Sequence, residues 1–369
     1  MPALVPARLG FLEGVPYSET FGDVYHSAAG GIEQARHVFL QGNAVQERWA
    51  GRERFVILEA GFGLGLNFLA TWQAWKRDSR RCARLHYVAV EKHPFSLEDL
   101  RTLHEAFPEL KDEAAQLHAA WPPLVSGAHR AELEPGQVVL TLFFDDIKLL
   151  RELRLQADAI YLDGFSPAKN PEMWSAQTLR AVSRLAAPGA TAATWSVAAS
   201  VRTALEQTGF EVEKRPGFAS KKEMLVCRSR KTSGQPEPSR GKTAIVVGAG
   251  LAGAAMCERL CSRGWDVTLV ERHASPAQEG SGNLAGAFHP IVTPDDSVFA
   301  RLTRAAFLLS LRKFSALDAL RWDPCGALQL ARNEKEAASQ RAAVSALGLP
   351  AEYAQLVSRE EASAHAGVE

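Results

Sequence analysis

The segment RFVILEAGFGLGLNFLATWQAW, residues 54–75, joins a short apolar run to a glycine-rich turn and then to a helix-forming stretch. Residues 55–58 are β-formers, and Gly61, Gly63 and Gly65 follow them at alternate positions. Glycines in such a turn let a ligand approach the backbone closely, and the turn exposes the N-terminal end of the next helix. The segment therefore predicts the first strand, loop and helix of an α/β domain that binds a nucleotide-like ligand.

Further predicted strands follow, and the first three of them carry acidic residues at or just beyond their carboxyl ends. These strands lie in LHYVAVEKHP (85–94) with Glu91, VVLTLFFDDI (138–147) with Asp145 and Asp146, and ADAIYLDGFSP (157–167) with Asp163. A fifth strand within 189–196 and two short strands within 210–217 and 221–229, which can pair as a hairpin, complete the series. Ligands of open α/β sheets bind outside the carboxyl ends of the strands, so the acids mark the expected site.

A glycine loop followed by an acid on the second strand is shared by nicotinamide-dependent enzymes and by methyltransferases that use S-adenosylmethionine. Three features favour the methyl donor: the GxGxG loop begins with Glu59-Ala60, the sheet ends in an antiparallel hairpin, and Asp163-Gly-Phe-Ser-Pro167 follows the fourth strand. Amino-methyltransferases keep a short acidic or amide motif at that place. We therefore predict a class I, Rossmann-like methyltransferase domain, with a plain strand-to-helix turn as the alternative for the glycines taken alone.

A second glycine pattern stands in AIVVGAGLAG, residues 244–253, where Gly248, Gly250 and Gly253 form GxGxxG between a predicted strand and helix. Glu271 lies 18 residues after Gly253, at the end of the next predicted strand. A carboxylate there accepts a ribose 2′-hydroxyl of FAD or NAD. The pattern predicts a second domain of Rossmann type that binds a dinucleotide.

The stretch RKTSGQPEPSRGK, residues 230–242, is rich in Pro, Ser and Gly and has no apolar periodicity, which is typical of a linker. We predict a first domain over 1–229, a linker over 230–242 and a second domain over 243–369.

The composition is that of an ordinary globular protein, with 46% hydrophobic and 23% charged residues and a formal net charge of zero. No apolar run reaches 18 residues, so we expect no membrane span. The N-terminal residues have no basic region followed by an apolar core, so we expect no secretory signal. Five scattered cysteines favour reduced thiols in the cytoplasm. No set of ligands at metal-binding spacing is complete, and we expect no metal.

Three segments carry a resemblance to a known family. LEAGFGLGLNFL (58–69), YLDGFSPAKNPEMW (161–174) and GDVYHSAAGGIEQARHVFLQGNAVQERW (22–49) resemble the methyltransferase half of the bifunctional tRNA 5-methylaminomethyl-2-thiouridine biosynthesis proteins. The linker, AIVVGAGLAG and GSGNLAGAFHP (280–290) are similar, in the same order, to the FAD-dependent oxidoreductase half of that family. The resemblance covers essentially the whole chain.

The resemblance implies two activities on the wobble uridine of certain tRNAs. The flavin half removes the carboxymethyl part of a 5-carboxymethylaminomethyl group oxidatively, and the other half then methylates the resulting amine. An alkyl amine is mostly protonated at neutral pH, so the site must take its proton before it can attack the methyl group. Asp163 is the residue that we expect to act as this catalytic base, with a turn-capping role as its alternative.

The remaining expected site residues fall into three sets. We expect S-adenosylmethionine to be bound by Glu59, Gly61, Phe62, Gly63, Gly65, Asn67, Glu91 and Asp146. We expect FAD to be bound by Gly248, Gly250, Gly253, Glu271, Ser281, Gly282 and Asn283. The resemblance suggests substrate contacts for Tyr25, Arg36, Gln41, Asn43, Lys169, Asn170 and Trp174. Surface placement is the alternative for the first four, and packing is the alternative for Trp174.

Oxidoreductases of this type bury FAD between the dinucleotide-binding segments and a substrate domain, and later return to the nucleotide-binding domain. The sequence to residue 369 contains neither a substrate-domain sheet nor a returning glycine-rich segment. We therefore expect a C-terminally shortened chain that is colourless or holds FAD weakly, keeps methyl transfer and loses the oxidative step.

Three rival interpretations remain open at this stage. One is a methyltransferase for a small-molecule amine with an unrelated appended domain, and another is a tRNA-binding protein without turnover. A nicotinamide-dependent dehydrogenase is the rival for the second half alone.

Overall fold

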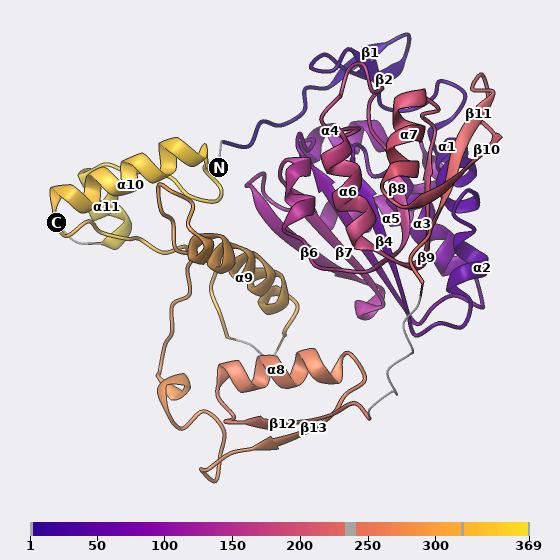
Figure 1. Ribbon diagram of the computed structural model, residues 1–369. Coiled ribbons are helices and arrows are strands. Elements are labelled where there is room, and N and C mark those ends of the chain that lie inside the picture. The colour runs from indigo at the N-terminus through magenta and orange to yellow at the C-terminus, as the bar shows by residue number, and fades with distance from the viewer. Residues whose placement is uncertain (1–2, 233–240, 319–320, 368–369) are drawn as a thin grey trace. The chain divides into compact units, whose positions relative to one another are not determined.

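Strand β4 (Arg54–Ala60), the first strand predicted from the sequence, lies inside an eight-stranded sheet (Figure 1). The computed structural model describes residues 3–232, 241–318 and 321–367. The strands follow one another across the sheet in the order β10 (Phe210–Pro216), β11 (Glu223–Ser229), β9 (Ala186–Thr194), β8 (Ala157–Leu162), β4, β5 (Arg84–Glu91), β7 (Val138–Phe144) and β6 (Gly127–Leu133). The five strands from β9 to β7 are mutually parallel.

The side chains of β4 show how the sheet separates two apolar cores. Phe55 and Ile57 belong to one buried cluster, whereas Leu58 and Ala60 belong to the other. Successive side chains of a strand point to opposite faces, so a parallel strand covered on both sides reads as a continuous apolar run. For this reason the apolar run of residues 55–58 is sufficient to indicate a central strand.

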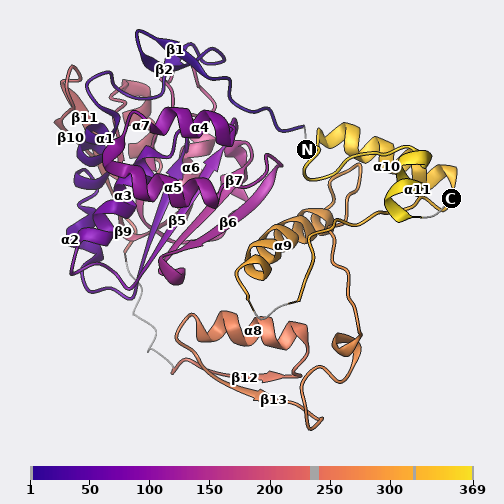
Figure 2. The same cartoon turned by 180° about the vertical axis from the view of Figure 1, so that it is seen from behind.

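Helices cover both faces of the sheet (Figures 1 and 2). The first cluster includes residues from α3 (Leu66–Arg77), α4 (Leu97–His104) and α5 (Lys111–Ala119), and the second includes residues from α6 (Ala176–Leu185) and α7 (Ala199–Gln207). Two short helices, α1 (Gly31–Gln34) and α2 (Val45–Trp49), flank a π-helical segment, η1 (Ala35–Gln41). The predicted α/β class and the predicted hairpin, β10 with β11, are confirmed.

Two parts of this unit were not predicted. Strands β1 (Gly10–Leu12), β2 (Val15–Ser18) and β3 (Asp23–Val24) form a small antiparallel sheet. Strand β6 adds an antiparallel edge to the main sheet beside β7. Both are short or alternate weakly in hydrophobicity, which gives little signal in a sequence.

Residues Met1–Thr232, Pro290–Asp323 and Leu328–Glu369 group into one compact unit. Helix α9 (Val298–Ser315) contacts β6, where Lys313 Nζ lies 2.7 Å from Glu132 Oε2 and Arg312 Nη1 donates to the carbonyl of Arg130 at 2.8 Å. Two further helices follow, α10 (Glu334–Leu347) and α11 (Arg359–Ala366). The boundaries predicted at 229/230 and 242/243 stay predictions, and most of the predicted linker falls on residues 233–240, outside the described residues.

The second unit holds β12 (Thr243–Val247), α8 (Leu251–Cys261) and β13 (Asp266–Val270). The two strands are parallel and the helix connects them, which confirms the predicted strand, glycine loop, helix and strand. Ile245 and Val247 are 71% and 82% exposed. In the described part of the chain no helix is both long and apolar enough to cross a membrane.

Asn43 shows how the segment before the main sheet is fixed to it. Its side chain is fully buried, donates to the carbonyl of Phe39 at 2.9 Å and accepts from the hydroxyl of Thr191 on β9 at 2.7 Å. Each of these two groups has a further partner, since Thr191 Oγ1 also accepts from Arg48 at 2.6 Å and the carbonyl of Phe39 also accepts from the N–H of Asn43 at 3.3 Å, and the amide adds one buried hydrogen bond to each. Asn43 therefore joins η1 to the edge of β9.

Replacing Asn43 by Ala should lower the free energy of unfolding by about 1–3 kcal/mol, because two buried hydrogen bonds, to the carbonyl of Phe39 and from the hydroxyl of Thr191, are lost. Urea unfolding followed by tryptophan fluorescence measures this change. Gln41→Ala, two residues away and exposed, is the matched control and should shift stability by less than about 0.5 kcal/mol. Equal stability of the two variants would show that the Asn43 contacts contribute nothing.

Candidate functional site

A cavity of about 540 Å³ opens at the carboxyl ends of the parallel strands, where the acids of the sequence were expected to meet. Its walls come from the loops after β4, β5, β7, β8 and β9, from residues 21–29, and from the loop of the β10–β11 hairpin. Of the predicted residues, the lining includes Tyr25, Gly61, Phe62, Gly63, Asn67, Glu91, Asp146, Asp163 and Asn170.

The glycine loop after β4 adopts a conformation in which side chains at Gly61 and Gly65 would clash with neighbouring atoms. Gly61 has φ +91°, and a Cβ atom there would lie 2.2 Å from the carbonyl oxygen of Asp163. Gly65 has φ +76° at the start of α3, and its Cβ would lie 2.7 Å from the ring of Phe62. Side chains at these positions would separate the loop from the end of β8. The loop therefore brings the ends of β4 and β8 into direct contact at the cavity floor.

Glu91 at the end of β5 holds the same loop from the other side. One carboxylate oxygen accepts from the backbone N–H of Phe62 at 3.1 Å and of Gly63 at 2.8 Å, and the other accepts from the N–H of His93 at 2.7 Å. The carboxylate lines the cavity while making these contacts. Glu91 thus presents an acceptor to a ligand and fixes the loop that the ligand would approach.

The amide of Asn67, in the first turn of α3, joins two carboxyl groups. Its Nδ2 donates to Glu59 Oε1 at 2.8 Å and to Asp163 Oδ2 at 2.7 Å. Glu59 is fully buried and lies outside the cavity lining, whereas Asp163 is half-buried and faces the cavity. Of these two acids, only Asp163 can reach a bound molecule.

The two acids differ in their electrostatics. Burial raises the pKa of Glu59 well above its ordinary value, despite the hydrogen bond from Asn67. Burial also raises the pKa of Asp163, to about 6, while hydrogen bonds from Asn67 and Trp195 act in the opposite direction. Asp163, with a pKa of about 6, is mostly charged at neutral pH, whereas burial disfavours the charged form of Glu59, and this difference suits Asp163 for proton transfer.

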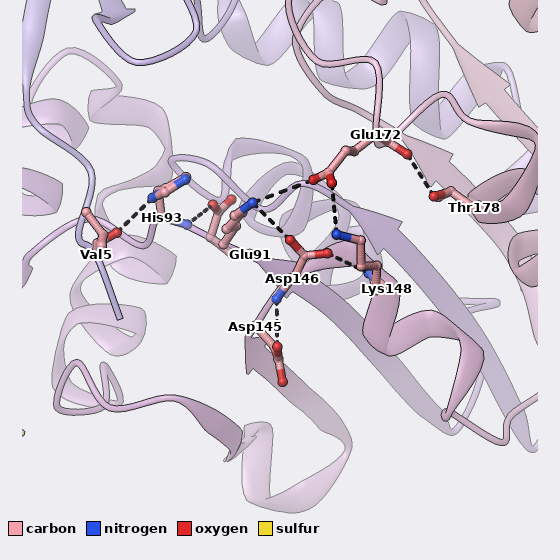
Figure 3. A network of polar contacts seen from close by, with 9 residues as sticks. Val5, Glu91, His93, Asp145, Asp146, Lys148, Glu172 and Thr178 are labelled. Atoms are coloured by element: carbon pink, nitrogen blue, oxygen red, sulfur yellow. Dashed lines mark hydrogen bonds and ion pairs between the residues drawn. The ribbon is translucent and has the colours of Figure 1, made fainter. Parts of the chain in front are cut away.

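A network of ion pairs ties together the loops after β5, β7 and β8 at the cavity wall (Figure 3). Lys92 Nζ lies 2.9 Å from Asp146 Oδ2 and 3.7 Å from Glu172 Oε2, and Lys148 Nζ lies 2.8 Å from the other oxygen of Glu172. Asp146 also accepts from the backbone N–H of Lys148 at 3.0 Å. Asp146 therefore reaches the cavity with both oxygens already engaged.

The predicted substrate residues do not all reach the cavity. Tyr25 and Asn170 line it. Burial, and to a smaller extent the negative charge of Glu91, raises the pKa of Tyr25, so its hydroxyl stays protonated. Lys169 donates to the carbonyl of Gly22 and lies 3.5 Å from Asp23, which attaches its loop to β3.

The other four residues of that set lie outside the cavity lining. Trp174 packs in the second core and donates to the carbonyl of Phe165 at 2.8 Å, which fits the packing interpretation. Arg36 donates to Gln73 at 3.0 Å, and Gln41 is exposed on η1. Neither lines the cavity, which fits surface placement, and Asn43 is buried as described above.

Sequence reasoning missed an aromatic and basic wall of the cavity. Trp195 comes directly after β9, and Phe218 and Lys221 lie in the hairpin loop between β10 and β11. The available signal was positional, because Trp195 ends the fifth predicted parallel strand and so had to face the same edge as Asp163.

The second unit has a separate hollow of about 490 Å³ beside its glycine loop, lined by Gly248, Gly250, Glu271 and Ser281 among others. Glu271 accepts from the backbone N–H of Ala249 at 2.6 Å, which repeats the contact of Glu91 with its own loop. Gly253 allows close packing, since a Cβ there would lie 1.8 Å from the carbonyl oxygen of Gly248. Gly282 and Asn283 follow Ser281 in the chain without lining the hollow.

The residues of each site fit the cofactor expected there. The first cavity combines the side-chain-free backbone of Gly61 and Gly63 with the carboxylate of Glu91, a hydrogen-bond acceptor of the kind that ribose hydroxyls need, and its acids suit a positively charged sulfonium. The second hollow combines Gly248, Gly250 and Glu271 beside the start of α8, which suits a dinucleotide. Among the described residues no group of three or more His, Cys, Asp or Glu is arranged to hold a metal ion.

Two family models match this chain. Residues 108–230 match an S-adenosyl-L-methionine-dependent methyltransferase family, and residues 243–368 match an FAD dependent oxidoreductase family. The MNMC2 protein of Aquifex aeolicus, known from a crystal structure, is 24% identical with a TM-score of 0.47, over 63% of this chain and 73% of that one.

Two curated relatives share half of their aligned residues with this chain. The tRNA 5-methylaminomethyl-2-thiouridine biosynthesis bifunctional protein of Aromatoleum aromaticum is 51% identical over 98% of this chain, and that of Paraburkholderia xenovorans is 49% identical over 99%. The chain spans 58% of the length of each of these relatives. By sequence, the chain belongs to the family of the tRNA 5-methylaminomethyl-2-thiouridine biosynthesis bifunctional proteins.

Proposed function

We propose that this chain is a tRNA-modifying enzyme whose first unit transfers a methyl group from S-adenosylmethionine to the amine of a 5-aminomethyl (or 5-aminomethyl-2-thio) wobble uridine. The product is the 5-methylaminomethyl nucleoside. The observation that carries the proposal is the half-buried Asp163 on the floor of a cavity whose glycine loop fits the methyl donor. Because tRNA is the proposed substrate, we also propose that the chain acts in the cytoplasm.

The chemistry requires an amine nitrogen with a free lone pair. In its protonated form the amine cannot attack, so a nearby base must take the proton, which we assign to Asp163 with its pKa of about 6. The nitrogen then forms the new bond to the methyl carbon as the sulfonium C–S bond breaks. When bound, S-adenosylmethionine supplies this activated methyl group.

The residues around Asp163 have different roles in positioning the base, the donor and the nucleotide. The absence of a side chain at Gly61, where a Cβ atom would lie 2.2 Å from the carbonyl oxygen of Asp163, lets the acid lie next to the donor loop, and Asn67 donates to its carboxylate. Glu91 would bind the ribose of the donor, and Tyr25 and Asn170 would contact the nucleotide. Such positioning converts a reaction of separate molecules into one within a complex.

We propose that the second unit supports the preceding step, in which FAD-dependent oxidation removes the carboxymethyl group from 5-carboxymethylaminomethyluridine. Gly248, Gly250 and Gly253 and the start of α8 would hold the cofactor, with Glu271 on its ribose and Ser281 alongside. Gly282 and Asn283 would follow in the same loop. FAD supplies the oxidising equivalent when bound. The match of residues 243–368 to an FAD-dependent oxidoreductase family supports this assignment over a nicotinamide-dependent one.

The two steps are tested by nucleoside mass analysis after incubation with two tRNAs. A tRNA that carries the aminomethyl group should gain one methyl group when S-adenosylmethionine is present. A tRNA that carries the carboxymethylaminomethyl group should lose its carboxymethyl group when FAD is present if the second unit performs the proposed step, whereas the expectation drawn from the sequence is no loss. Methylation of a free amine with no change in either tRNA would favour the small-molecule enzyme, and binding of tRNA without turnover would favour the non-catalytic protein.

Replacing Asp163 by Asn keeps the volume and an acceptor for Asn67 but removes the charge beside the amine. We expect the single-turnover rate of methyl transfer to fall about a hundredfold, the range for a positioned acid–base group. The dissociation constant of S-adenosylmethionine, measured by calorimetry, should change little. Asp112→Asn, on the exposed side of α5, is the control. A fall in rate together with an equal fall in donor affinity would make Asp163 a donor ligand and not a base.

The two ribose acids provide controls for each other. Glu91→Ala should raise the dissociation constant of S-adenosylmethionine about tenfold or more, since a hydrogen bond to a charged group contributes roughly 1.5–3 kcal/mol. Glu271→Ala should weaken FAD binding, measured from flavin absorbance after dialysis. Neither change should affect the cofactor of the other unit. Loss of both cofactors in either variant would contradict the assignment of separate sites.

A further inference from the structure

One wall of the methyltransferase cavity is built from Trp195 and the hairpin loop that follows β10. Trp195 leaves β9 one residue after its end and lies partly exposed in the cavity. Phe218 and Met224 line the cavity beside it. This wall belongs to the end of β9 and to the β10–β11 loop, whereas the glycine loop and Glu91 lie at the ends of β4 and β5. The cavity therefore has a donor side and a second side, and Asp163 stands between them.

Trp195 is coupled to Asp163 directly. Hydrogen bonding from the Trp195 side chain opposes the rise in the pKa of Asp163 that burial causes. Trp195 and Asp163 both line the cavity, and the Trp195 side chain is partly exposed there. A flat group stacked on the ring would therefore lie beside Asp163.

The face of Trp195 is covered by a single cation. Lys221 Nζ lies 4.7 Å from the centroid of the Trp195 ring, within the range of a cation–π interaction. Within the described part of the chain, Lys221 forms no ion pair with a carboxylate. A cation–π interaction at an exposed ring is weak, so a phosphate group could draw the Lys221 ammonium group away from the ring.

The hairpin loop presents Lys221 in a defined way. The N–H of Lys221 donates to the carbonyl of Phe218 at 3.0 Å, and the N–H of Gly217 donates to the carbonyl of Lys222 at 3.0 Å. Ala219 between them has φ +51°, which is uncommon for a residue with a side chain. The loop is a closed turn, so the ammonium group can move while its backbone stays in place.

We propose that the indole face of Trp195 is the surface on which the uracil ring of the target nucleotide stacks, and that Lys221 covers this face until RNA draws it to a phosphate. The proposal rests on the proposed function and adds the residues that recognise the base. Enzymes that act on a base take it out of its stack and hold it against aromatic side chains. Stacked in this way, the ring directs its C5 substituent toward Asp163.

Trp195 and Lys221 make different contributions to binding. Trp195 contacts the base, so its loss weakens binding of the free nucleoside and of tRNA alike. Lys221 contacts a phosphate, so its loss weakens tRNA binding alone. For a nucleoside without phosphate, removal of Lys221 uncovers the ring and leaves binding equal or tighter.

The test compares Trp195→Ala, Trp195→Phe and Lys221→Gln with the unchanged chain. The readouts are KM and kcat for aminomethyl-tRNA, the dissociation constant of 5-aminomethyluridine and that of S-adenosylmethionine. Trp195→Ala should raise KM and the nucleoside dissociation constant about tenfold, the effect of losing one stacked base, and Trp195→Phe should restore most of it. The donor dissociation constant should stay the same in all three variants.

Lys221→Gln should weaken tRNA binding and reduce the slope of its salt dependence by about one, without weakening nucleoside binding. Lys222→Gln, next in the chain and outside the cavity lining, is the control for nucleoside binding. If the Trp195→Ala variant does not fold, the measurements on Lys221→Gln test the proposal without it.

Two results would overturn the proposal: an unchanged KM and nucleoside affinity in a folded Trp195→Ala variant, or equal weakening of nucleoside and tRNA by Lys221→Gln. If the unchanged chain transfers no methyl group to tRNA while it still binds the donor, the proposed function fails, and the stacking proposal fails with it.

Discussion

The hydrogen bonds from the single amide group of Asn67 to two carboxyl groups are the constraint on which this site depends. Asn67 sits in the first turn of α3, Glu59 on β4 and Asp163 just after β8, so one side chain joins three elements at the cavity floor. Two carboxylates so close together repel each other, and burial makes the charged form costly. Burial raises the pKa of Glu59 well above its ordinary value, whereas Asp163, which faces the cavity, has a pKa of about 6 and carries charge at neutral pH. Without the amide, neither the direction nor the charge of Asp163 would be fixed.

In both units an acidic side chain accepts hydrogen bonds from the backbone of the glycine loop. A loop without side chains allows close approach of a cofactor, but its backbone N–H groups then need partners. Glu91 accepts from Phe62 and Gly63, and Glu271 accepts from Ala249. In each case the acid that would bind ribose also holds the loop in place. A cofactor that enters either site finds its acceptor and its loop already arranged.

The sequence predicted the parallel strands and the donor side of the site because both depend on local pattern. Continuous apolar runs such as residues 55–58 and acids at strand ends, such as Glu91 and Asp163, can be recognised one segment at a time. Contacts between distant segments could not be recognised in this way. Trp174 resembled a stacking residue because of its motif, yet it packs in the core, while Trp195 belongs to no motif and lines the cavity. Glu59 resembled a cofactor ligand because it precedes the glycines, yet Asn67 separates it from the cavity. Asn43 resembled a substrate residue among apolar neighbours, yet it is bonded to β9.

The most direct test of this account is the pKa of Asp163 itself, measured by carboxyl-carbon NMR titration in the unchanged chain and in an Asn67→Ala variant. The account predicts titration near 6 in the unchanged chain. In the variant the pKa should be higher, because burial still opposes the charge while the hydrogen bond that lowers the pKa is lost. A pKa near the ordinary value of 3.8 in both proteins would contradict the account, since Asp163 would then be a solvated acid that Asn67 does not control.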